Sequence, residues 1–215
     1  AAVTGLGNDS EQSVSPGIVV LDANTLEQKT KIETGEITPF GLGINAQTQK
    51  IYAVDTRKGL VGVYDLKTGK EVAVIENSGN ESNHLRQAVV DEGTNKIYIS
   101  AFGGIERDGK KGPASAVWVI DGATDTLESV IVSPVQSAAG LALDAGKQRL
   151  YVADLSNSKI AEVDIKTQNV LRTFDSVSLE GDAKAQPFDT INLAIDTKNN
   201  VLYAINQKSG GVSLI

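Results

Sequence analysis

The sequence predicts an all-β fold built from a repeated unit of four short strands, and three observations carry this prediction. Short runs rich in Val, Ile, Leu and Tyr recur along the 215 residues and are separated by turn-forming Asp, Asn, Thr and Gly. A tyrosine-centred motif occurs four times at nearly constant spacing. No stretch shows the sustained period of an amphipathic helix. Repetition at one fixed phase indicates a repeated architecture and argues against an ordinary β-sandwich.

The repeat is recognised by a tyrosine and by the polar residue that stands seven positions before it. The tyrosines are spaced by 46, 53 and 52 residues, and four of the five in the chain occupy this position. The pairs are Asn45 with Tyr52, Asp91 with Tyr98, Asp144 with Tyr151, and Asp196 with Tyr203. Four strands in about 50 residues is the blade of a β-propeller. The predicted fold class is therefore an all-β propeller with four-stranded blades.

Each blade is expected to run from an innermost strand A to an outermost strand D. Strand A is the apolar run closed by the Asn or Asp, as in residues 41–44, and strand B holds the tyrosine. Strand C carries the pattern Val-x-Asp-x-x-Thr or a close variant, as in residues 63–68, and its Asp side chain bonds the following turn. Strand D is a short β-branched run such as 72–75. Because the tyrosine recurs in every blade, we expect it to pack between blades.

Both ends of the chain fall inside the motif. The pattern counts about eighteen strands, which is about four and a half blades of four strands each. Residues 1–215 are therefore expected to form a single propeller domain that is incomplete at both ends, and a ring built from two chains is the alternative. The Ala-Ala start is also compatible with cleavage of a signal peptide at small residues, in which case the leader is not in this chain.

The repeat unit that contains Tyr98 carries an insertion between strands B and C. Tyr52 and Tyr151 each stand 13 residues before the Asp of strand C, whereas Tyr98 stands 23 residues before it. The extra residues belong to a Gly-rich stretch over 103–115, whose basic residues are Arg107, Lys110 and Lys111. The stretch lacks the phosphate-binding loop pattern. It is interpreted as a solvated hairpin, and the alternative is a recognition loop that contacts an anionic ligand.

Composition excludes several kinds of site. The chain has a formal net charge of −7, no cysteine and one histidine. It therefore has no disulfide and no cysteine nucleophile, and one copy cannot form a His-rich metal site. The acidic balance argues against binding nucleic acid through bulk charge. No run of about 18 apolar residues could span a membrane as a helix. We expect no metal, no cofactor and no membrane span.

Several stretches of the repeat match the motifs of a known family. They are Leu150-Tyr151-Val152-Ala153, Ile97-Tyr98-Ile99-Ser100, Val117-Trp118-Val119-Ile120-Asp121-Gly122, Pro39-Phe40-Gly41 and Gly140-Leu141-Ala142-Leu143-Asp144. Over about residues 17–215 the sequence resembles the YVTN-repeat β-propellers, and most closely their YncE-like branch of bacterial periplasmic proteins. The resemblance implies a seven-bladed ring, a periplasmic location and a non-catalytic binding role. It also implies that the protein could bind single-stranded DNA, because such binding is associated with this branch.

Candidate binding residues lie in the loops that join strand D to strand A and strand B to strand C, because the rigid blades position these loops. His84 and Arg86 form the best candidate pair. They could serve as a general base or as a clamp for an anion. The alternative is that His84 is an exposed loop residue and that Arg86 bonds carbonyl groups in the central channel. Phe40 and Phe188 stand at matching phases before strand A, where they stack on bases or plug the gap between blades. The ligand-binding candidates are Arg86, His84, Arg57, Phe40, Phe188, Arg107, Lys110 and Lys111.

The predicted function is that of a non-catalytic periplasmic binding or interaction protein with a small-molecule or protein ligand on the loop face. The sequence contains no Gly-x-Ser-x-Gly and no His-Glu-x-x-His, so we expect no catalytic residue and no enzyme activity. One alternative is single-stranded DNA binding through Arg86, Arg57, Lys58 and the basic insertion. The other is a lactonase-like hydrolase in which Arg86 and His84 polarise the ring carbonyl.

Overall fold

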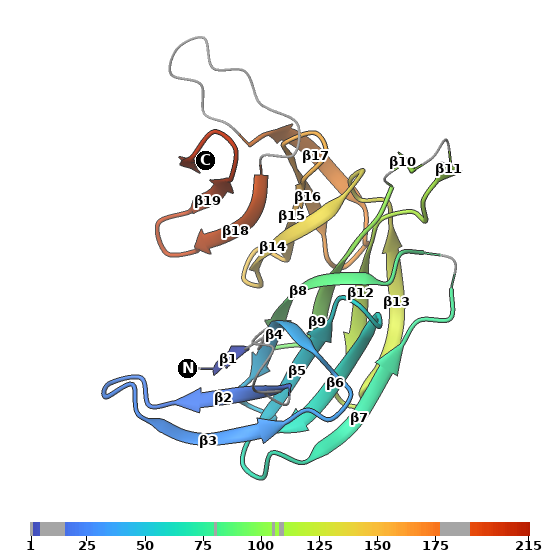
Figure 1. Cartoon of the computed structure of the whole chain (residues 1–215). Coiled ribbons are helices and arrows are strands. Elements are labelled where there is room, and N and C mark those ends of the chain that lie inside the picture. The colour runs from blue at the N-terminus through green and yellow to red at the C-terminus, as the bar shows by residue number, and fades with distance from the viewer. Residues whose placement is uncertain (1, 5–15, 80, 105, 108–109, 177–189) are drawn as a thin grey trace.

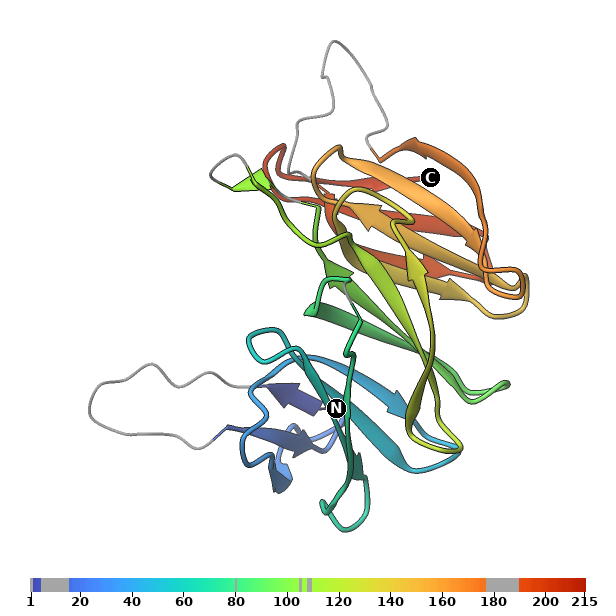
Figure 2. The ribbon, with the colours of Figure 1, turned by 90° about the vertical axis from the view of Figure 1, so that its right-hand side faces the viewer.

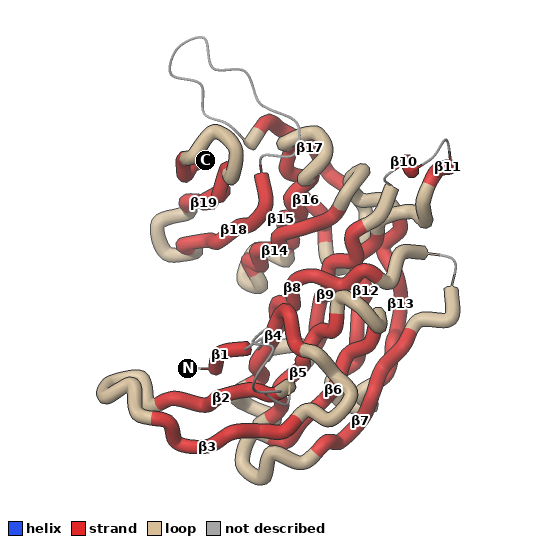
Figure 3. The backbone as a smooth tube through the Cα atoms, in the orientation of Figure 1, coloured by secondary structure: helices blue, strands red, loops and turns tan. Residues whose placement is uncertain are grey.

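The computed structural model describes residues 2–4, 16–79, 81–104, 106–107, 110–176 and 190–215. These residues form twenty strands and no helix. Figure 3 shows that strands make up most of the chain and that short loops connect them. The strands belong to five blade sheets, numbered here in chain order, and to one short hairpin.

Three of the sheets have the four strands of a complete blade. Blade 2 contains β4 (Pro39–Asn45), β5 (Lys50–Asp55), β6 (Leu60–Asp65) and β7 (Glu71–Glu76). Blade 3 contains β8 (His84–Asp91), β9 (Lys96–Phe102), β12 (Ala116–Asp121) and β13 (Thr126–Val132). Blade 4 contains β14 (Ala138–Asp144), β15 (Arg149–Asp154), β16 (Lys159–Asp164) and β17 (Val170–Asp175). In each blade the strands pair in chain order.

The first and last sheets have three strands each within the described residues. Blade 1 contains β1 (Ala2–Thr4), β2 (Gly17–Leu21) and β3 (Gln28–Glu33). Blade 5 contains β18 (Thr190–Asp196), β19 (Val201–Asn206) and β20 (Gly211–Leu214). The insertion of blade 3 forms the hairpin of β10 (Glu106–Arg107) and β11 (Lys110–Lys111). The four-stranded blade is confirmed, whereas the seven-bladed ring and the single domain open at both ends stay predictions.

The blades follow one another around a common axis (Figures 1 and 2). Their strands A face this axis, because β4 contacts β8, β8 contacts β14, and β14 contacts β18. The outermost strands β7, β13 and β17 form the other edges of the three complete sheets. This arrangement confirms the predicted propeller and the predicted order of the strands from A to D.

The core lies between neighbouring blades. Tyr52 of β5 and Trp118 of β12 are fully buried in one apolar cluster that joins blades 2 and 3. Tyr98 of β9 is buried in the cluster between blades 3 and 4. Tyr151 packs from blade 4 against the cluster shared with blade 5. Burying a large apolar side chain contributes about 1.5–3 kcal/mol. The prediction that the repeated tyrosine packs between blades is confirmed for these three residues.

The aspartates that end strand C hold the turn behind it. Asp65 Oδ1 accepts the backbone N–H groups of Lys67 and Thr68 at 3.1 and 2.7 Å. Asp164 Oδ1 accepts the N–H group of Thr167 in the same way at 2.9 Å. These backbone hydrogen bonds lower the pKa of both carboxyl groups, because they stabilise the charged form. The turn-forming role predicted for these aspartates is confirmed.

Candidate ligand-binding site

Each strand A from β4 to β18 is interrupted by a β-bulge near its start. The register with strand B shifts between Pro39 and Gly41 in β4, and matching shifts occur in β8, β14 and β18. A bulge leaves residues without a cross-strand partner and re-aims their side chains. The bulged residues are Phe40, Arg86 with Gln87, Ala139 with Gly140, and Ile191.

These bulged residues line one cavity of about 360 Å³ beside the axis. The wall is completed by Gly41, Leu155, Asn192 and Ile205. A Cβ atom at Gly41 would lie 2.3 Å from the carbonyl oxygen of Arg86. A Cβ atom at Gly140 would lie 2.5 Å from the Cα atom of Asn192. The strands A of neighbouring blades therefore approach this closely only because glycine stands at both positions.

Arg86 brings a positive charge to this cavity. Its guanidinium carbon lies 4.9 Å from the centroid of the Phe102 ring and 5.6 Å from that of the Phe40 ring. Its Nε atom is buried and has no hydrogen-bond partner. Within the described residues Arg86 forms no ion pair. Burial lowers the pKa of the guanidinium, which nevertheless keeps its proton because arginine does not deprotonate in proteins.

Gln87 joins blade 3 to blade 4 next to the cavity. Its backbone N–H donates to Ser100 Oγ at 3.2 Å, and that hydroxyl donates to the carbonyl oxygen of Ala139. Its side-chain Oε1 accepts the N–H of Leu141 at 2.8 Å. The position of the Gln87 side chain is therefore set by the neighbouring blade.

The chain was compared with known proteins, and no protein-family model matches it. The YncE protein of Salmonella typhi is 31% identical over 218 residues, which cover 98% of this chain and 57% of the relative. The YncE protein of Escherichia coli strain K12 is 28% identical over the same shares of the two chains. The chain is similar to the YncE proteins along nearly its whole length. It spans little more than half the length of these relatives, which are themselves uncharacterized.

Solved structures support the fold of this chain. A chain in the crystal structure of a nidogen/laminin complex matches with a TM-score of 0.71 and 16% identity, over 94% of this chain and 68% of that chain. A chain of the Kuenenia stuttgartiensis hydrazine synthase matches with a TM-score of 0.62 and 13% identity, over 93% of this chain and 59% of that chain. Identities this low support the fold alone.

The structure brings together two of the predicted binding residues of the chain. Arg86 and Phe40 meet in the cavity, and the Phe40 side chain is 51% exposed, so it does not plug a gap between blades. Both residues belong to strands, β8 and β4, and not to the loops in which the sequence placed them. The reason is that strand A begins one or two residues before its bulge, so that the bulged residue lies within the strand.

The remaining predicted binding residues are not brought together with Arg86 and Phe40 in the part of the chain that the structure describes. His84 is exposed at the start of β8, and Arg57 is exposed in the turn between β5 and β6. Neither residue lines the cavity. Arg107, Lys110 and Lys111 belong to the β10–β11 hairpin, which projects from the body of the molecule (Figures 1 and 2). Phe188 lies outside the described residues.

Blade 3 departs from the repeat where it contributes Arg86. Three residues after the tyrosine, blades 2, 4 and 5 carry Asp55, Asp154 and Asn206, but blade 3 carries Ala101. Asp55 shows what the acid does, because its Oδ2 accepts the N–H of Thr38 and its Oδ1 accepts the N–H of Arg57, both at 2.8 Å. Blade 3 lacks this clamp between its loops and carries the insertion instead. Phe102, directly after Ala101, then supplies a ring to Arg86.

Sequence reasoning missed most of the cavity wall. Phe102, Gln87, Asn192 and Leu155 were not predicted as binding residues, although all but Phe102 line the cavity and Phe102 holds its arginine. The missing acid at Ala101, together with the ten-residue insertion, is the sequence signal that could have singled out blade 3. No comparable signal marks Asn192 or Leu155.

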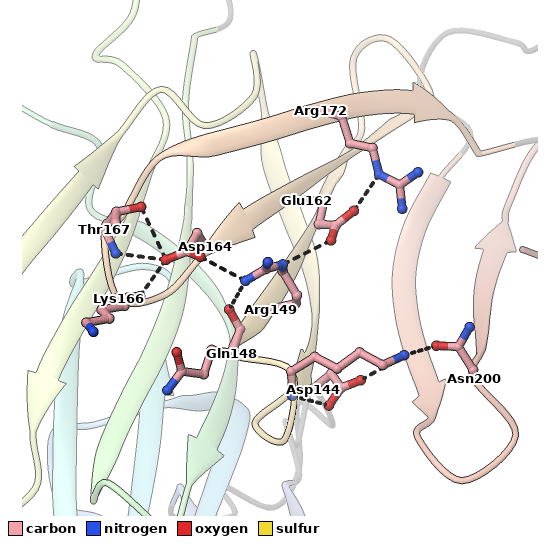
Figure 4. A network of polar contacts seen from close by, with 10 residues as sticks. Asp144, Gln148, Arg149, Glu162, Asp164, Lys166, Thr167, Arg172 and Asn200 are labelled. Atoms are coloured by element: carbon pink, nitrogen blue, oxygen red, sulfur yellow. Dashed lines mark hydrogen bonds and ion pairs between the residues drawn. The ribbon is translucent and has the colours of Figure 1, made fainter.

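A second arginine cluster lies at the opposite ends of the strands, in blade 4 (Figure 4). Arg149 bonds Glu162 at 3.2 Å and Asp164 at 2.8 Å, and Arg172 bonds the same Glu162. The cluster borders a cavity of about 550 Å³ between blades 4 and 5 that Lys147 also lines. Each arginine here is neutralised by carboxylates of its own blade, so the cluster is interpreted as structural.

Neither a metal site nor a membrane segment is found in the part of the chain that the structure describes. No three His, Asp or Glu side chains gather there as a metal site would require. No helix in that part is long and apolar enough to cross a membrane. The expectation that the protein needs no metal and no cofactor stays a prediction.

Proposed function

We propose that this chain belongs to a non-catalytic binding protein of the periplasm, and that its ligand enters the cavity formed by the bulged residues of β4, β8, β14 and β18. One observation carries the proposal. Four successive blades direct unpaired residues into a single cavity that holds a half-buried arginine without a counter-ion among the described residues. The bulge recurs in these four strands, but among them only β8 places an arginine there, so this position departs from the repeat. The periplasmic location rests on the family resemblance and stays a prediction.

The chemistry of the lining residues favours binding over catalysis. The cavity is lined by apolar side chains, glycines, two amides and Arg86. A nucleophile or a general acid–base pair requires Ser, Cys, Asp, Glu, His, Lys or Tyr, and no described lining residue is of these types. His84, which the lactonase alternative needs beside Arg86, is exposed outside the cavity.

Single-stranded DNA is a less favourable ligand for this cavity. Sequence-tolerant binding of single strands needs a basic groove that follows the backbone and aromatic rings on which successive bases stack. Phe40 offers one exposed ring beside Arg86, but Arg57 lies outside the cavity, and the exposed Lys58 pairs with Glu36 at 2.8 Å. A small ligand or a short protein segment fits the cavity better, because its size lies within the range of small-molecule sites.

A blocked cavity tests the binding proposal. A fragment library screened by protein-observed NMR is expected to perturb the backbone amides of Gly41, Gln87 and Gly140 together. Ile205→Trp places a bulky ring on a half-exposed position of the cavity wall and should abolish these perturbations. Val72→Trp is the matched control, because Val72 is similarly exposed on the distant strand β7. Perturbations that map elsewhere, or that survive Ile205→Trp, would overturn the proposal.

Lactone hydrolysis tests the non-catalytic part separately. We expect the protein to hydrolyse a simple lactone such as gluconolactone no faster than buffer does. Turnover above buffer that falls in both His84→Ala and Arg86→Ala would establish the lactonase alternative instead. Ring opening read at constant pH by base titration gives the rate directly.

A further inference from the structure

We infer that the cavity selects a small ligand that carries a single carboxylate on an apolar body, and that Arg86 binds this carboxylate. The inference rests on the proposed function, because it names the ligand class of the same cavity. Its basis is the arrangement of hydrogen-bond donors and acceptors in the wall, which is independent of the bulge geometry.

The polar side chains of the wall present donors to the cavity. Gln87 uses its Oε1 atom to accept the N–H of Leu141 at 2.8 Å. Asn192 uses its Oδ1 atom to accept the N–H of Leu193 at 2.9 Å. In each amide the oxygen already accepts one backbone N–H, whereas the NH₂ group can only donate, so both side chains can offer donors to an anion. Together with the guanidinium of Arg86, the wall offers N–H groups from three side chains, and no described lining residue is acidic.

Arg86 is held ready for an anion. The rings of Phe102 and Phe40 fix its guanidinium by cation–π contacts, and its Nε atom remains buried without a partner. An unpaired buried charge is unfavourable, and an anion that reaches it recovers the missing interactions. The planar fork of a guanidinium matches the two oxygens of a carboxylate and forms two parallel hydrogen bonds with it.

The remaining lining sets the charge and the body of the ligand. One arginine balances one negative charge, which favours a monocarboxylate over a polyanion. Ile191 and Ile205 leave 36% and 45% of their side chains exposed beside that charge, and Leu155 also lines the wall. Apolar groups in this position cover the hydrocarbon part of a ligand whose charged end lies at Arg86. A volume of about 360 Å³ accommodates a molecule of that size.

A matched pair of probes tests the inference by isothermal titration calorimetry. The probes are 3-phenylpropionate and its neutral isostere 3-phenylpropionamide. We expect the acid to bind at least about tenfold more tightly than the amide, because a hydrogen-bonded ion pair is lost in the amide. Arg86→Gln should weaken the acid about tenfold or more and leave the amide within about twofold, so that the two probes become equal. Arg57→Gln removes an exposed arginine outside the cavity and should change neither affinity.

A second variant shows whether weaker binding in Arg86→Gln comes from the lost charge or from a misfolded cavity. Phe40→Leu keeps the charge of Arg86 but removes one of the two rings that hold its guanidinium, so it should weaken the acid more than the amide, and less than Arg86→Gln does. Inorganic phosphate and a ten-nucleotide deoxythymidine strand are titrated alongside, and both should bind more weakly than the acid.

The outcomes separate this inference from the proposed function. Equal binding of acid and amide in the wild-type cavity would overturn the carboxylate inference and keep the binding function. Phosphate or the oligonucleotide binding more tightly than the acid, and doing so through Arg86, would also overturn it. If neither probe perturbs the cavity amides while other fragments do, the ligand class is wrong but the site is right. If no small molecule reaches the cavity, the inference and the proposed function both fail.

Discussion

Two arginine sites at opposite ends of the strands differ in whether their positive charge is paired with a carboxylate. Arg149 and Arg172 in blade 4 are paired with Glu162 and Asp164 of the same sheet (Figure 4). Arg86 in blade 3 lies near two aromatic rings and has no carboxylate partner within the described residues. The charges of the first site are balanced within its own sheet, whereas the charge of the second is not balanced by any described carboxylate.

The difference follows from strand register. Arg149 stands directly opposite Asp164 on β16, and Glu162 stands opposite Arg172 on β17. Opposite charges in such cross-strand positions pair by geometry alone. Arg86 falls within the bulge of β8, where the register passes from Leu85 to Ala88 without a partner for it. The bulge therefore leaves Arg86 without the cross-strand partner that an arginine in a regular strand position has.

Gly41→Ala is expected to have the largest effect, because it disrupts the close approach of β4 and β8 that forms the Arg86 site. The new Cβ atom would lie 2.3 Å from a backbone oxygen of β8, so β4 and β8 must move apart. We expect a loss of about 2–3 kcal/mol in the free energy of unfolding, together with loss of probe binding. Urea denaturation measures the first effect.

The control for this substitution is Gly146→Ala in the turn of blade 4. Its Cβ atom would meet only Asp144 Oδ1, at 3.4 Å, which is an ordinary contact. Its free energy of unfolding should stay within about 0.5 kcal/mol of wild type. Equal effects of the two substitutions would show that the close approach of β4 and β8 is not required.

Removing one charge from each arginine site should change the free energy of unfolding by different amounts. Glu162→Gln leaves Arg149 and Arg172 without their shared buried carboxylate, so we expect a loss of about 1–2 kcal/mol in the free energy of unfolding. Arg86→Gln should change it by no more than about 0.5 kcal/mol, because losing the cation–π contacts is offset by removing an unpaired charge. Thermal melts of both variants are compared with wild type. A large destabilisation by Arg86→Gln would mean that Arg86 is structural.

The smallest expected effect is the change of stability in acid, which should arise at the carboxylates of the blade 4 site and of similar turns and not at the Arg86 site. The turn hydrogen bonds from Thr167 lower the pKa of Asp164, and the bond from Lys29 lowers the pKa of Asp22 to about 2. A carboxyl whose pKa is lower in the folded state contributes stability above its ordinary value of 3.8, and that contribution is lost as the pH falls toward the folded pKa. The melting temperature should therefore fall between about pH 4 and pH 2, and less steeply in Asp164→Asn.

The same acid titration followed by NMR compares the two ends directly. The backbone amide of Thr167 should shift as Asp164 is protonated, because it donates to that carboxylate. The amide of Gly140 should stay unchanged over the same range, because no described residue lining its cavity is acidic. Equal shifts at both amides would show that a carboxylate near the cavity is protonated over the same pH range and would count against an unbalanced Arg86.

The candidate site could be predicted only in part from the sequence. Arg86 and Phe40 were identified as binding residues because both were expected in the loops that join strand D to strand A. That the two side chains touch depends on the contact between β4 and β8, which brings together residues 46 positions apart. Phe102 depends on the pairing of β8 with β9 past the bulge. Neither pairing nor bulge leaves a local pattern in the chain.

What the sequence determined by itself is the blade. The tyrosine spacing and the turn aspartates act over a few residues, so the repeat alone assigns Tyr52 to packing and Asp65 to a turn. What only the tertiary structure decided is which arginine of the blade strands is left without a carboxylate partner among the described residues. Arg149, Arg172 and Arg86 are alike in the sequence, and only register, bulge and burial distinguish them. The physical reason is that a charge is balanced by its neighbours in space, which the chain order does not specify.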